Sequence, residues 1–217
     1  GWEIVGKADI DCPEVYETAP GADICIDFSG AGAMPKLLAY LRRTKTPLLS
    51  GTTGLTEPDL DALYALGDTI PVIWTANYST GIAVLRRMLR DCGVALADWD
   101  REIVEIHHNQ KVDAPSGTAI ALADVMNQAA GGDYEYVYDR STRREKRPEK
   151  EIGISAVRGG TIVGDHDVIF AGQDEVITFS HMAYSRKLFA TGAVSAAKFL
   201  AGKPAGMYDM SRVIEGK

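Results

Sequence analysis

Three features are scarce or missing in this sequence of 217 residues, and each excludes a class of protein. No apolar run approaches the ~20 residues that span a membrane, so we expect no membrane association. The three cysteines, Cys12, Cys25 and Cys92, are widely spaced and form no CxxC pair, which indicates free thiols in a reducing cytoplasm. Basic residues are outnumbered, 23 Lys and Arg against 30 Asp and Glu, and the net charge of −7 argues against nucleic-acid binding.

The first half of the sequence alternates between strand and helix patterns. The expected strands are short apolar runs at residues 3–5, 22–28, 47–50 and 71–75. The expected helices cover residues 34–43, residues 56–67 and a stretch through Leu85, Met88 and Leu89. Strict alternation of this kind predicts an α/β fold with a Rossmann-like, doubly wound parallel sheet.

Small polar residues follow three of these expected strands. They are Ser29–Gly30, Gly51–Thr52–Thr53 and Ala76–Asn77–Tyr78–Ser79. Ligands of open α/β sheets bind at the carboxyl ends of the strands, where bare backbone N–H groups can approach an anion or a flat ring. Any one of these segments alone reads more simply as a connecting loop, but three in one half favour a nucleotide-type site.

The second half is richer in strands and predicts a smaller α+β domain. Expected elements are a helix at 116–130, strands at 152–157, 167–171 and 175–181, and a hairpin turn at Gln173–Asp174. The charged stretch 140–151 is expected to be a solvated loop, and a helix at 186–200 is expected to return to the first domain. The domain boundaries are therefore placed at 1–79 with 187–217 for dinucleotide binding, and at 80–186 for substrate binding and oligomerisation.

The segment from residue 107 to residue 118 carries the most chemistry. It joins two imidazoles, His107 and His108, the ammonium of Lys111, and a helix start at Ser116–Gly117–Thr118. An imidazole or an ammonium within hydrogen-bond reach can transfer a proton, and a helix start offers oriented N–H groups to a carboxylate. This loop is therefore the candidate site for holding an anionic substrate and protonating it.

Other interpretations of these residues remain open. Adjacent histidines in a strand point to opposite faces, so we expect no metal site. His108 is equally well interpreted as a structural hydrogen-bonding residue, and Asp113 as an acceptor that fixes the loop. His166 and His181 are expected to be structural, while Arg158 could belong to a turn or to a ligand clamp.

Residues 105–119, E-I-H-H-N-Q-K-V-D-A-P-S-G-T-A, resemble the signature of bacterial dihydrodipicolinate reductase. The segments 26–29, 51–54 and 76–79 are similar to the cofactor-domain loops of that family. Residues 157–166 resemble its substrate-domain hairpin, and residues 207–210 its C-terminal segment. The resemblance covers nearly the whole chain from about residue 22.

The resemblance implies reduction of 4-hydroxy-tetrahydrodipicolinate to tetrahydrodipicolinate with NADH or NADPH, in diaminopimelate and lysine biosynthesis, by a cytoplasmic homotetramer. It assigns proton transfer to His107 and Lys111, and contact with the small dicarboxylate substrate to His108, Gly117 and Thr118. The helix-start argument adds Ser116 to the substrate-binding residues. The residues implied for the nicotinamide side are Gly51, Thr52, Thr53, Ala76, Asn77, Tyr78 and Ser79.

The sequence as written departs from the family at its start, where no glycine-rich strand-turn is found. Residues 1–9 resemble the family's second strand, which would end at Asp9, a candidate acceptor for ribose hydroxyls; Ile10 in place of an arginine favours NADH. A fragment, a misassigned start and a naturally short protein are all open, and we expect weak dinucleotide affinity for this chain. The alternatives are a non-catalytic, dicarboxylate-binding remnant and another two-domain nicotinamide enzyme of the aspartate pathway.

Overall fold

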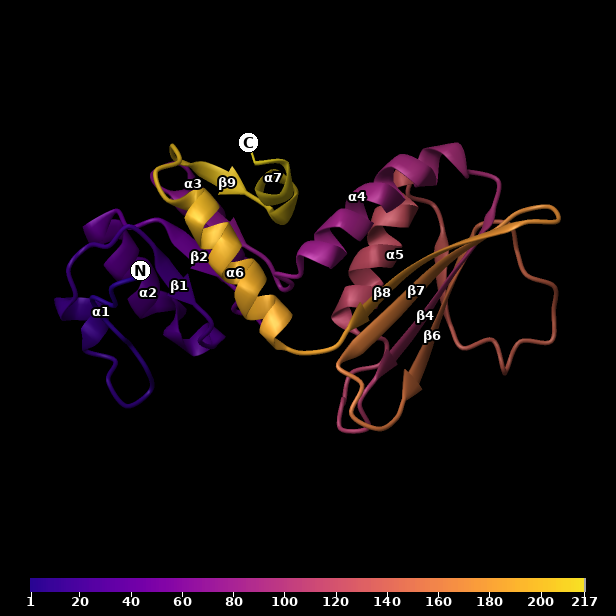
Figure 1. Ribbon diagram of the computed structural model, residues 1–217, viewed down its shortest axis with the longest axis horizontal. Coiled ribbons are helices and arrows are strands. Elements are labelled where there is room, and N and C mark those ends of the chain that lie inside the picture. The colour runs from indigo at the N-terminus through magenta and orange to yellow at the C-terminus, as the bar shows by residue number, and fades with distance from the viewer. Residues whose placement is uncertain (217) are drawn as a thin grey trace. The chain divides into compact units, whose positions relative to one another are not determined.

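The computed structural model describes residues 1–216, which divide into two compact units (Figure 1). The first unit joins Gly1–Thr80 to the C-terminal segment that begins at Phe189, and the second unit is Gly81–Leu188. Within the described residues, every helix is too short or too polar to cross a membrane.

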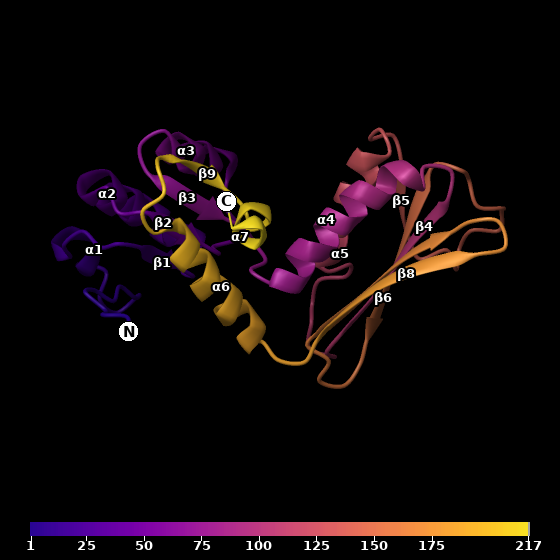
Figure 2. The same ribbon diagram turned by 45° about the horizontal axis from the view of Figure 1, so that its top comes forward.

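The first unit contains a four-stranded parallel sheet with the order β1-β2-β3-β9. Its strands are β1 (Cys25–Asp27), β2 (Leu48–Ser50), β3 (Pro71–Trp74) and β9 (Gly206–Tyr208). Its longer helices are α2 (Met34–Thr44), α3 (Glu57–Gly67) and α6 (Lys187–Leu200). Helices α2 and α3 lie on one face of the sheet and α6 on the other (Figures 1 and 2), so the predicted doubly wound sheet is confirmed.

Local sequence explains the helices of this unit. Leu37 and Leu41 of α2 are buried on one stripe, as their spacing predicts. Thr56 caps α3 through a capping box, in which its backbone N–H and hydroxyl both donate to the Asp59 carboxylate at 3.0 and 2.7 Å. Helix α6 approaches the sheet very closely at Gly192, because a Cβ there would lie 1.8 Å from the Tyr78 carbonyl oxygen.

The predicted strand at residues 3–5 is wrong. These residues are exposed and have no regular secondary structure, and β1 pairs only with β2. An extended segment becomes a strand only when a neighbour completes its hydrogen bonds, and no such neighbour lies beside 3–5 within residues 1–216. The smaller elements of the unit, which the sequence patterns did not indicate, are α1 (Val15–Thr18), the 3₁₀ turn η1 (Ala31–Ala33) and α7 (Met210–Glu215).

The second unit contains a mixed five-stranded sheet with the order β5-β6-β4-β7-β8. Its strands are β4 (Asp100–His107), β5 (Glu135–Tyr138), β6 (Glu151–Arg158), β7 (Gly164–Ala171) and β8 (Val176–Ala183). Two helices, α4 (Thr80–Ala95) and α5 (Gly117–Ala129), cover one face of this sheet (Figures 1 and 2). Their apolar side chains form a core with the covered face of the sheet, which places the unit in the predicted α+β class.

The connections of the second unit confirm one predicted hairpin and correct another. Gly172 N–H donates to the Glu175 carbonyl at 2.9 Å, which closes the β7–β8 turn around Gln173 and Asp174. Residues 157–166 do not form a hairpin, because β6 and β7 flank β4 on opposite sides. The chain between them therefore crosses the end of β4 that carries His107.

The charged stretch 140–151 is only partly the solvated loop expected. Glu151 is buried as the first residue of β6, and Arg140 forms an ion pair with it. The Arg147 guanidinium donates to Asp100 at 2.6 Å and to Glu102 at 3.1 Å, both on β4. This loop is thus fixed to the sheet by ion pairs that link residues nearly fifty positions apart.

Candidate functional site

Strand β4 carries three polar side chains on its buried face. Side chains alternate along a strand, so Arg101, Ile103, Glu105 and His107 share the helix-covered face. Glu105 is fully buried and His107 is 8% exposed. An acid and an imidazole two residues apart are therefore brought together at the carboxyl end of β4, beside the start of α5.

Glu105 is the centre of a hydrogen-bonded cluster. His107 Nδ1 donates to Glu105 Oε2 at 2.5 Å, and Ser116 N–H donates to Oε1 at 3.0 Å. Arg158, at the end of β6, donates from Nη1 to Oε2 at 2.9 Å and from Nη2 to Oε1 at 2.8 Å. The two carboxylate oxygens thus accept four hydrogen bonds, two of them from a bidentate guanidinium.

The Glu105 carboxyl is ionised in this environment. Burial alone would raise its pKa, but hydrogen bonds from Arg158, His107 and the Ser116 N–H together hold the pKa below its ordinary value. The same contact with Glu105 raises the pKa of the Arg158 guanidinium, so both partners keep their charges. Sequence reasoning missed Glu105, although its two-residue spacing from His107 was a visible signal.

Ser116 caps α5, and its polar groups are used within the protein. Its hydroxyl accepts from the Ala119 N–H at 3.1 Å and contacts His166 Nε2 at 3.2 Å, while its own N–H binds Glu105. Gly117 is exposed, with open space where a Cβ would stand. Of the predicted helix-start residues, Ser116 is therefore buried and supports the helix start from inside, whereas Gly117 is exposed and Thr118 half-buried.

The loop before α5 carries the remaining predicted cations. Lys111 Nζ donates to Asp113 Oδ1 at 2.7 Å, and this hydrogen bond lowers the pKa of Asp113. His108 lies just beyond β4, where its Nε2 is 3.2 Å from Arg186 Nη2. Arg158 Nη2 donates to the Asp113 carbonyl at 2.7 Å, which fixes the loop. The observed contact agrees with the interpretation of Asp113 as a loop-fixing acceptor.

His166 of β7 also belongs to this cluster. Its ring centroid lies 5.2 Å from that of His107, in an edge-to-face arrangement. Burial, followed by the charge of nearby His107, lowers the pKa of His166 to about 4, so this ring is neutral near pH 7. Sequence reasoning expected only a structural role and did not place it beside His107, because the two residues meet only through strand pairing.

In the first unit, Asp27 links the carboxyl ends of two strands. Its Oδ2 accepts from the hydroxyls of Ser50 at 2.6 Å and Thr52 at 2.8 Å, and its Oδ1 accepts from the Ser29 hydroxyl at 2.6 Å. The Tyr78 hydroxyl donates to the Ser50 carbonyl at 2.7 Å. Predicted residues from two loops, Thr52 and Tyr78, are thus joined to one hydrogen-bonded framework.

The other predicted residues of this unit lie at the same edge of the sheet. Gly51 and Thr53 flank Thr52, and a Cβ on Gly51 would stand 2.3 Å from the Phe28 ring, so a side chain there would require that ring to move. In the following loop the Asn77 side chain accepts from the Ser79 N–H at 2.8 Å, next to the exposed Ala76. These hydrogen bonds give the loop a fixed shape at the carboxyl end of β3.

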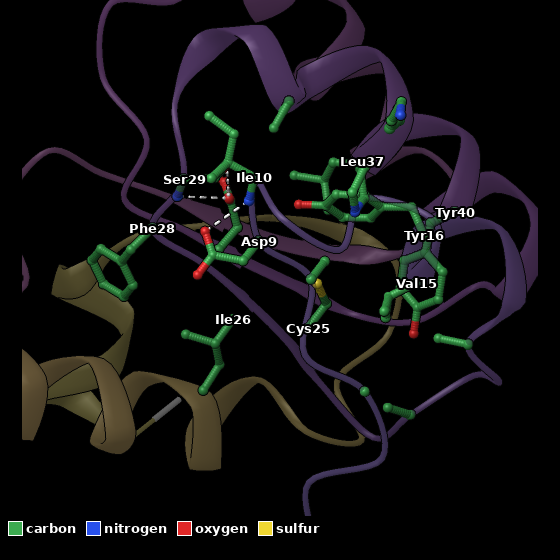
Figure 3. Close-up of a pocket in the computed structure, with 18 of the residues that line it drawn as sticks. Asp9, Ile10, Val15, Tyr16, Cys25, Ile26, Phe28, Ser29, Leu37 and Tyr40 are labelled. Atoms are coloured by element: carbon green, nitrogen blue, oxygen red, sulfur yellow. Dashed lines mark hydrogen bonds between the residues drawn. The ribbon is translucent and has the colours of Figure 1, made fainter.

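A cavity of about 860 Å³ opens beside β1 (Figure 3). Asp9, Phe28, Ser29 and Gly30 line it, and Asp9 accepts from the Ile10 N–H at 2.7 Å (Figure 3). Its volume falls within the range of ligand sites, and a carboxylate beside bare glycine backbone fits a ribose and its neighbouring phosphate. Of the eight residues predicted to bind the cofactor, only Asp9 lines this cavity, and the other seven lie at the ends of β2 and β3.

Residues 1–216 contain no group of three or more His, Cys, Asp or Glu side chains that could hold a metal ion. The polar groups of the second unit are instead arranged for hydrogen bonding and proton transfer. A buried carboxylate supports an imidazole, and an ammonium and a helix start lie on the same loop. This arrangement can bind an anion and exchange a proton with it.

Comparison with known proteins gives consistent matches for both units. Residues 5–78 match the family model described as dihydrodipicolinate reductase, N-terminus, and residues 81–214 match dihydrodipicolinate reductase, C-terminus. The chain is 48% identical to the 4-hydroxy-tetrahydrodipicolinate reductase of Caldanaerobacter subterraneus subsp. tengcongensis, covering 99% of this chain and 88% of that protein. It is 44% identical to the Clostridium tetani protein of the same name, covering 94% of this chain and 81% of that protein.

A solved structure supports the fold. Dipicolinate-bound dihydrodipicolinate reductase from Paenisporosarcina sp. TG-14 matches with a TM-score of 0.69 and 22% sequence identity. The match covers 86% of this chain and 71% of that chain. At this level of identity the likeness concerns the arrangement of helices and strands.

Proposed function

The chain belongs to the dihydrodipicolinate reductase family, and on that premise we propose that it reduces 4-hydroxy-tetrahydrodipicolinate to tetrahydrodipicolinate with a pyridine nucleotide. This reaction is a step of diaminopimelate and lysine biosynthesis. The single observation that carries the proposal is the His107–Glu105 pair, buried beside Lys111 and the start of α5. No comparison favours the non-catalytic remnant or another aspartate-pathway enzyme.

His107 and Lys111 are the groups that move the proton. The 4-hydroxyl group of the substrate must leave as water, and the resulting unsaturated ring must gain one hydride and one proton. A bound reduced nicotinamide would supply the hydride, and a side chain of the protein the proton. The His107 ring is held by Glu105 at the end of β4, and the Lys111 ammonium is held by Asp113 on the loop that follows. General acid catalysis by such a positioned group is worth roughly 10²–10⁴-fold in rate.

The substrate's carboxylates are bound by the same loop. Gly117 and Thr118 begin a 13-residue helix, whose first N–H groups and positive dipole end favour an anion. Lys111 and His108 add positive or hydrogen-bonding groups. A small dicarboxylate fits this set better than a neutral ligand, because the cluster offers donors and cations but few exposed acceptors.

The cofactor is assigned to the first unit. Asp9 would accept hydrogen bonds from the adenosine ribose, and the loops at Gly51–Thr52–Thr53 and Ala76–Asn77–Tyr78–Ser79 would hold the nicotinamide end. NADH is preferred in this proposal, because Ile10 follows Asp9 where an arginine would accommodate a 2′-phosphate. Competition between NADH and NADPH in a binding titration measures this preference.

We assign the domain roles and the assembly as follows. Residues 1–79 with 187–217 bind the dinucleotide, and residues 80–186 bind the substrate and form a homotetramer in the cytoplasm. Among residues 81–188, no helix covers the face of the five-stranded sheet opposite α4 and α5 (Figure 1). Val157, Val176 and Met182 are 46%, 61% and 54% exposed on that face, and exposed apolar side chains of this kind favour subunit contact.

The test is a coupled assay in which the preceding synthase generates the substrate in situ and nucleotide oxidation is followed. We expect oxidation by the wild-type chain, and a kcat lowered about 10²–10⁴-fold in H107A and in K111A. K150A is the matched control, because Lys150 is exposed and pairs only with Asp133 among the described residues. Absence of oxidation by the wild type, or near-normal turnover in both H107A and K111A, would contradict the proposal.

A further inference from the structure

We infer that Glu105, held by Arg158, is a positioning residue that fixes the tautomer and orientation of His107. This inference rests on the proposed function, in which His107 transfers the proton. Glu105 lies within the signature segment 105–119 and itself transfers no proton in the proposed mechanism. Its four hydrogen bonds and complete burial show that it is built into the site.

An ionised carboxylate can only accept hydrogen bonds, and this decides where the ring carries its proton. With His107 Nδ1 at 2.5 Å from Glu105 Oε2, the neutral ring must carry its proton on Nδ1. Nε2 is then the atom that gains and loses the proton in each cycle.

His107 Nε2 lies against Gly164, where the absence of a side chain leaves room for the ring. A Cβ on Gly164, the first residue of β7, would stand 2.8 Å from His107 Nε2. A larger residue at Gly164 would therefore press on the working end of the ring. Glu105 on one side and the bare backbone of Gly164 on the other define a single position for the imidazole.

Arg158 keeps Glu105 in place and connects it to the rest of the loop. Its two terminal nitrogens bind both carboxylate oxygens, and Nη2 also donates to the Asp113 carbonyl. The Ser116 N–H binds the same carboxylate, so the start of α5 and the His107 ring share one anchor. Glu105 therefore fixes the position of the His107 ring, which moves the proton, relative to the helix start that is assigned to the substrate.

The direct test is the tautomeric state of the His107 ring, measured by ¹H–¹⁵N NMR on protein with labelled histidine. The sequence has only four histidines, and H107Q assigns the resonances of interest. We expect the Nδ1–H form in the wild type. In E105Q the side-chain amide nitrogen must face either His107 Nδ1 or the Ser116 N–H. When it faces Nδ1 it donates to the ring, which requires Nδ1 without a proton, so the Nδ1–H form should lose population.

The kinetic test uses the same variants in the coupled assay. We expect E105Q to lower kcat by at least about 10²-fold while the KM for nucleotide changes less than about twofold, because misplacing a catalytic group affects turnover. R158K, which keeps the charge but not the bidentate geometry, should fall between E105Q and wild type. E102Q is the matched control, since Glu102 lies on the opposite face of the same strand and contacts Arg147.

If E105Q does not fold because Arg158 loses its counter-charge, the double variant E105Q/R158Q removes both charges, and circular dichroism verifies its fold. An Nε2–H ring in the wild type, or an E105Q variant with unchanged ring spectrum and kcat, overturns the inference. Failure of the proposed function is recognised separately, because a wild type that oxidises no nucleotide still reports its ring tautomer by NMR.

Discussion

Replacing His166 should flatten the dependence of folding stability on pH. His166 is 4% exposed, and its Nδ1 has no hydrogen-bond partner among residues 1–216. Burial and then the charge of His107 lower its pKa from 6.5 to about 4. On acidification the unfolded chain therefore takes up this proton first, and the folded state loses stability as pH falls from about 6.5 to about 4.

The size of the effect follows from those two pKa values. Between pH 8 and pH 5 the linkage amounts to about 2 kcal/mol in the free energy of unfolding, out of about 3.4 kcal/mol once both states are protonated. H166Q removes the titrating ring but keeps an amide near the Ser116 hydroxyl. We expect wild type to lose about 2 kcal/mol more than H166Q over that interval.

Urea unfolding at pH 8, 6.5 and 5 measures this difference. F170L is the matched control, because Phe170 is fully buried on the same strand and its loss costs the same at each pH. If H166Q and wild type lose stability in parallel as the pH falls, His166 does not remain neutral in the folded protein and the reasoning fails.

Three further changes should lower the free energy of unfolding, measured by urea denaturation. G192A should cost about 1–3 kcal/mol or more, since its Cβ would lie 1.8 Å from the Tyr78 carbonyl oxygen, whereas G32A meets open space and should be nearly neutral. R101M should cost about 2–4 kcal/mol, because the buried Arg101 guanidinium donates to the Leu96 and Ala97 carbonyls at the end of α4. S116A should cost about 1–2 kcal/mol through loss of the α5 cap.

Each of these expectations has a contradicting result. A G192A variant as stable as G32A would mean that α6 shifts away from the sheet without cost. An R101M variant with wild-type stability would mean that water satisfies the carbonyls of α4. An S116A variant that keeps full stability would mean that the hydrogen bond from the Ala119 N–H to the Ser116 hydroxyl contributes nothing to the helix start.

Local patterns were sufficient for elements whose stability is decided locally. The helices at 34–43 and 56–67 and the start of α5 at Ser116 were all predicted, and the structure contains each of them. The expected strand at residues 3–5 failed because its apolar pattern says nothing about whether a neighbouring strand is present. Strands β5 and β9 are short and were missed, because they become strands only by pairing with β6 and β3, which the local sequence does not indicate.

The candidate site was predictable only in the part that is contiguous in sequence. His107, Lys111 and the helix start lie within one segment, so their proximity could be read directly. Arg158 lies 53 positions from Glu105, and His166 lies 50 positions from Ser116. Only the order β6-β4-β7 places them together, and neither spacing nor composition contains that order.

The imidazole rings of His107 and His166 are in contact but have different hydrogen-bond partners. Positive charge on both rings at a centroid distance of 5.2 Å would be strongly unfavourable in a buried place. The Glu105 carboxylate binds His107, whereas His166 contacts the Ser116 hydroxyl through Nε2 and its Nδ1 has no hydrogen-bond partner among residues 1–216. A proton on His166 would therefore gain no carboxylate partner. Acidification should therefore destabilise the fold first at the Ser116–His166 contact, where a proton is least tolerated. Glu105 should be protonated only at lower pH, because its pKa is held below the ordinary value.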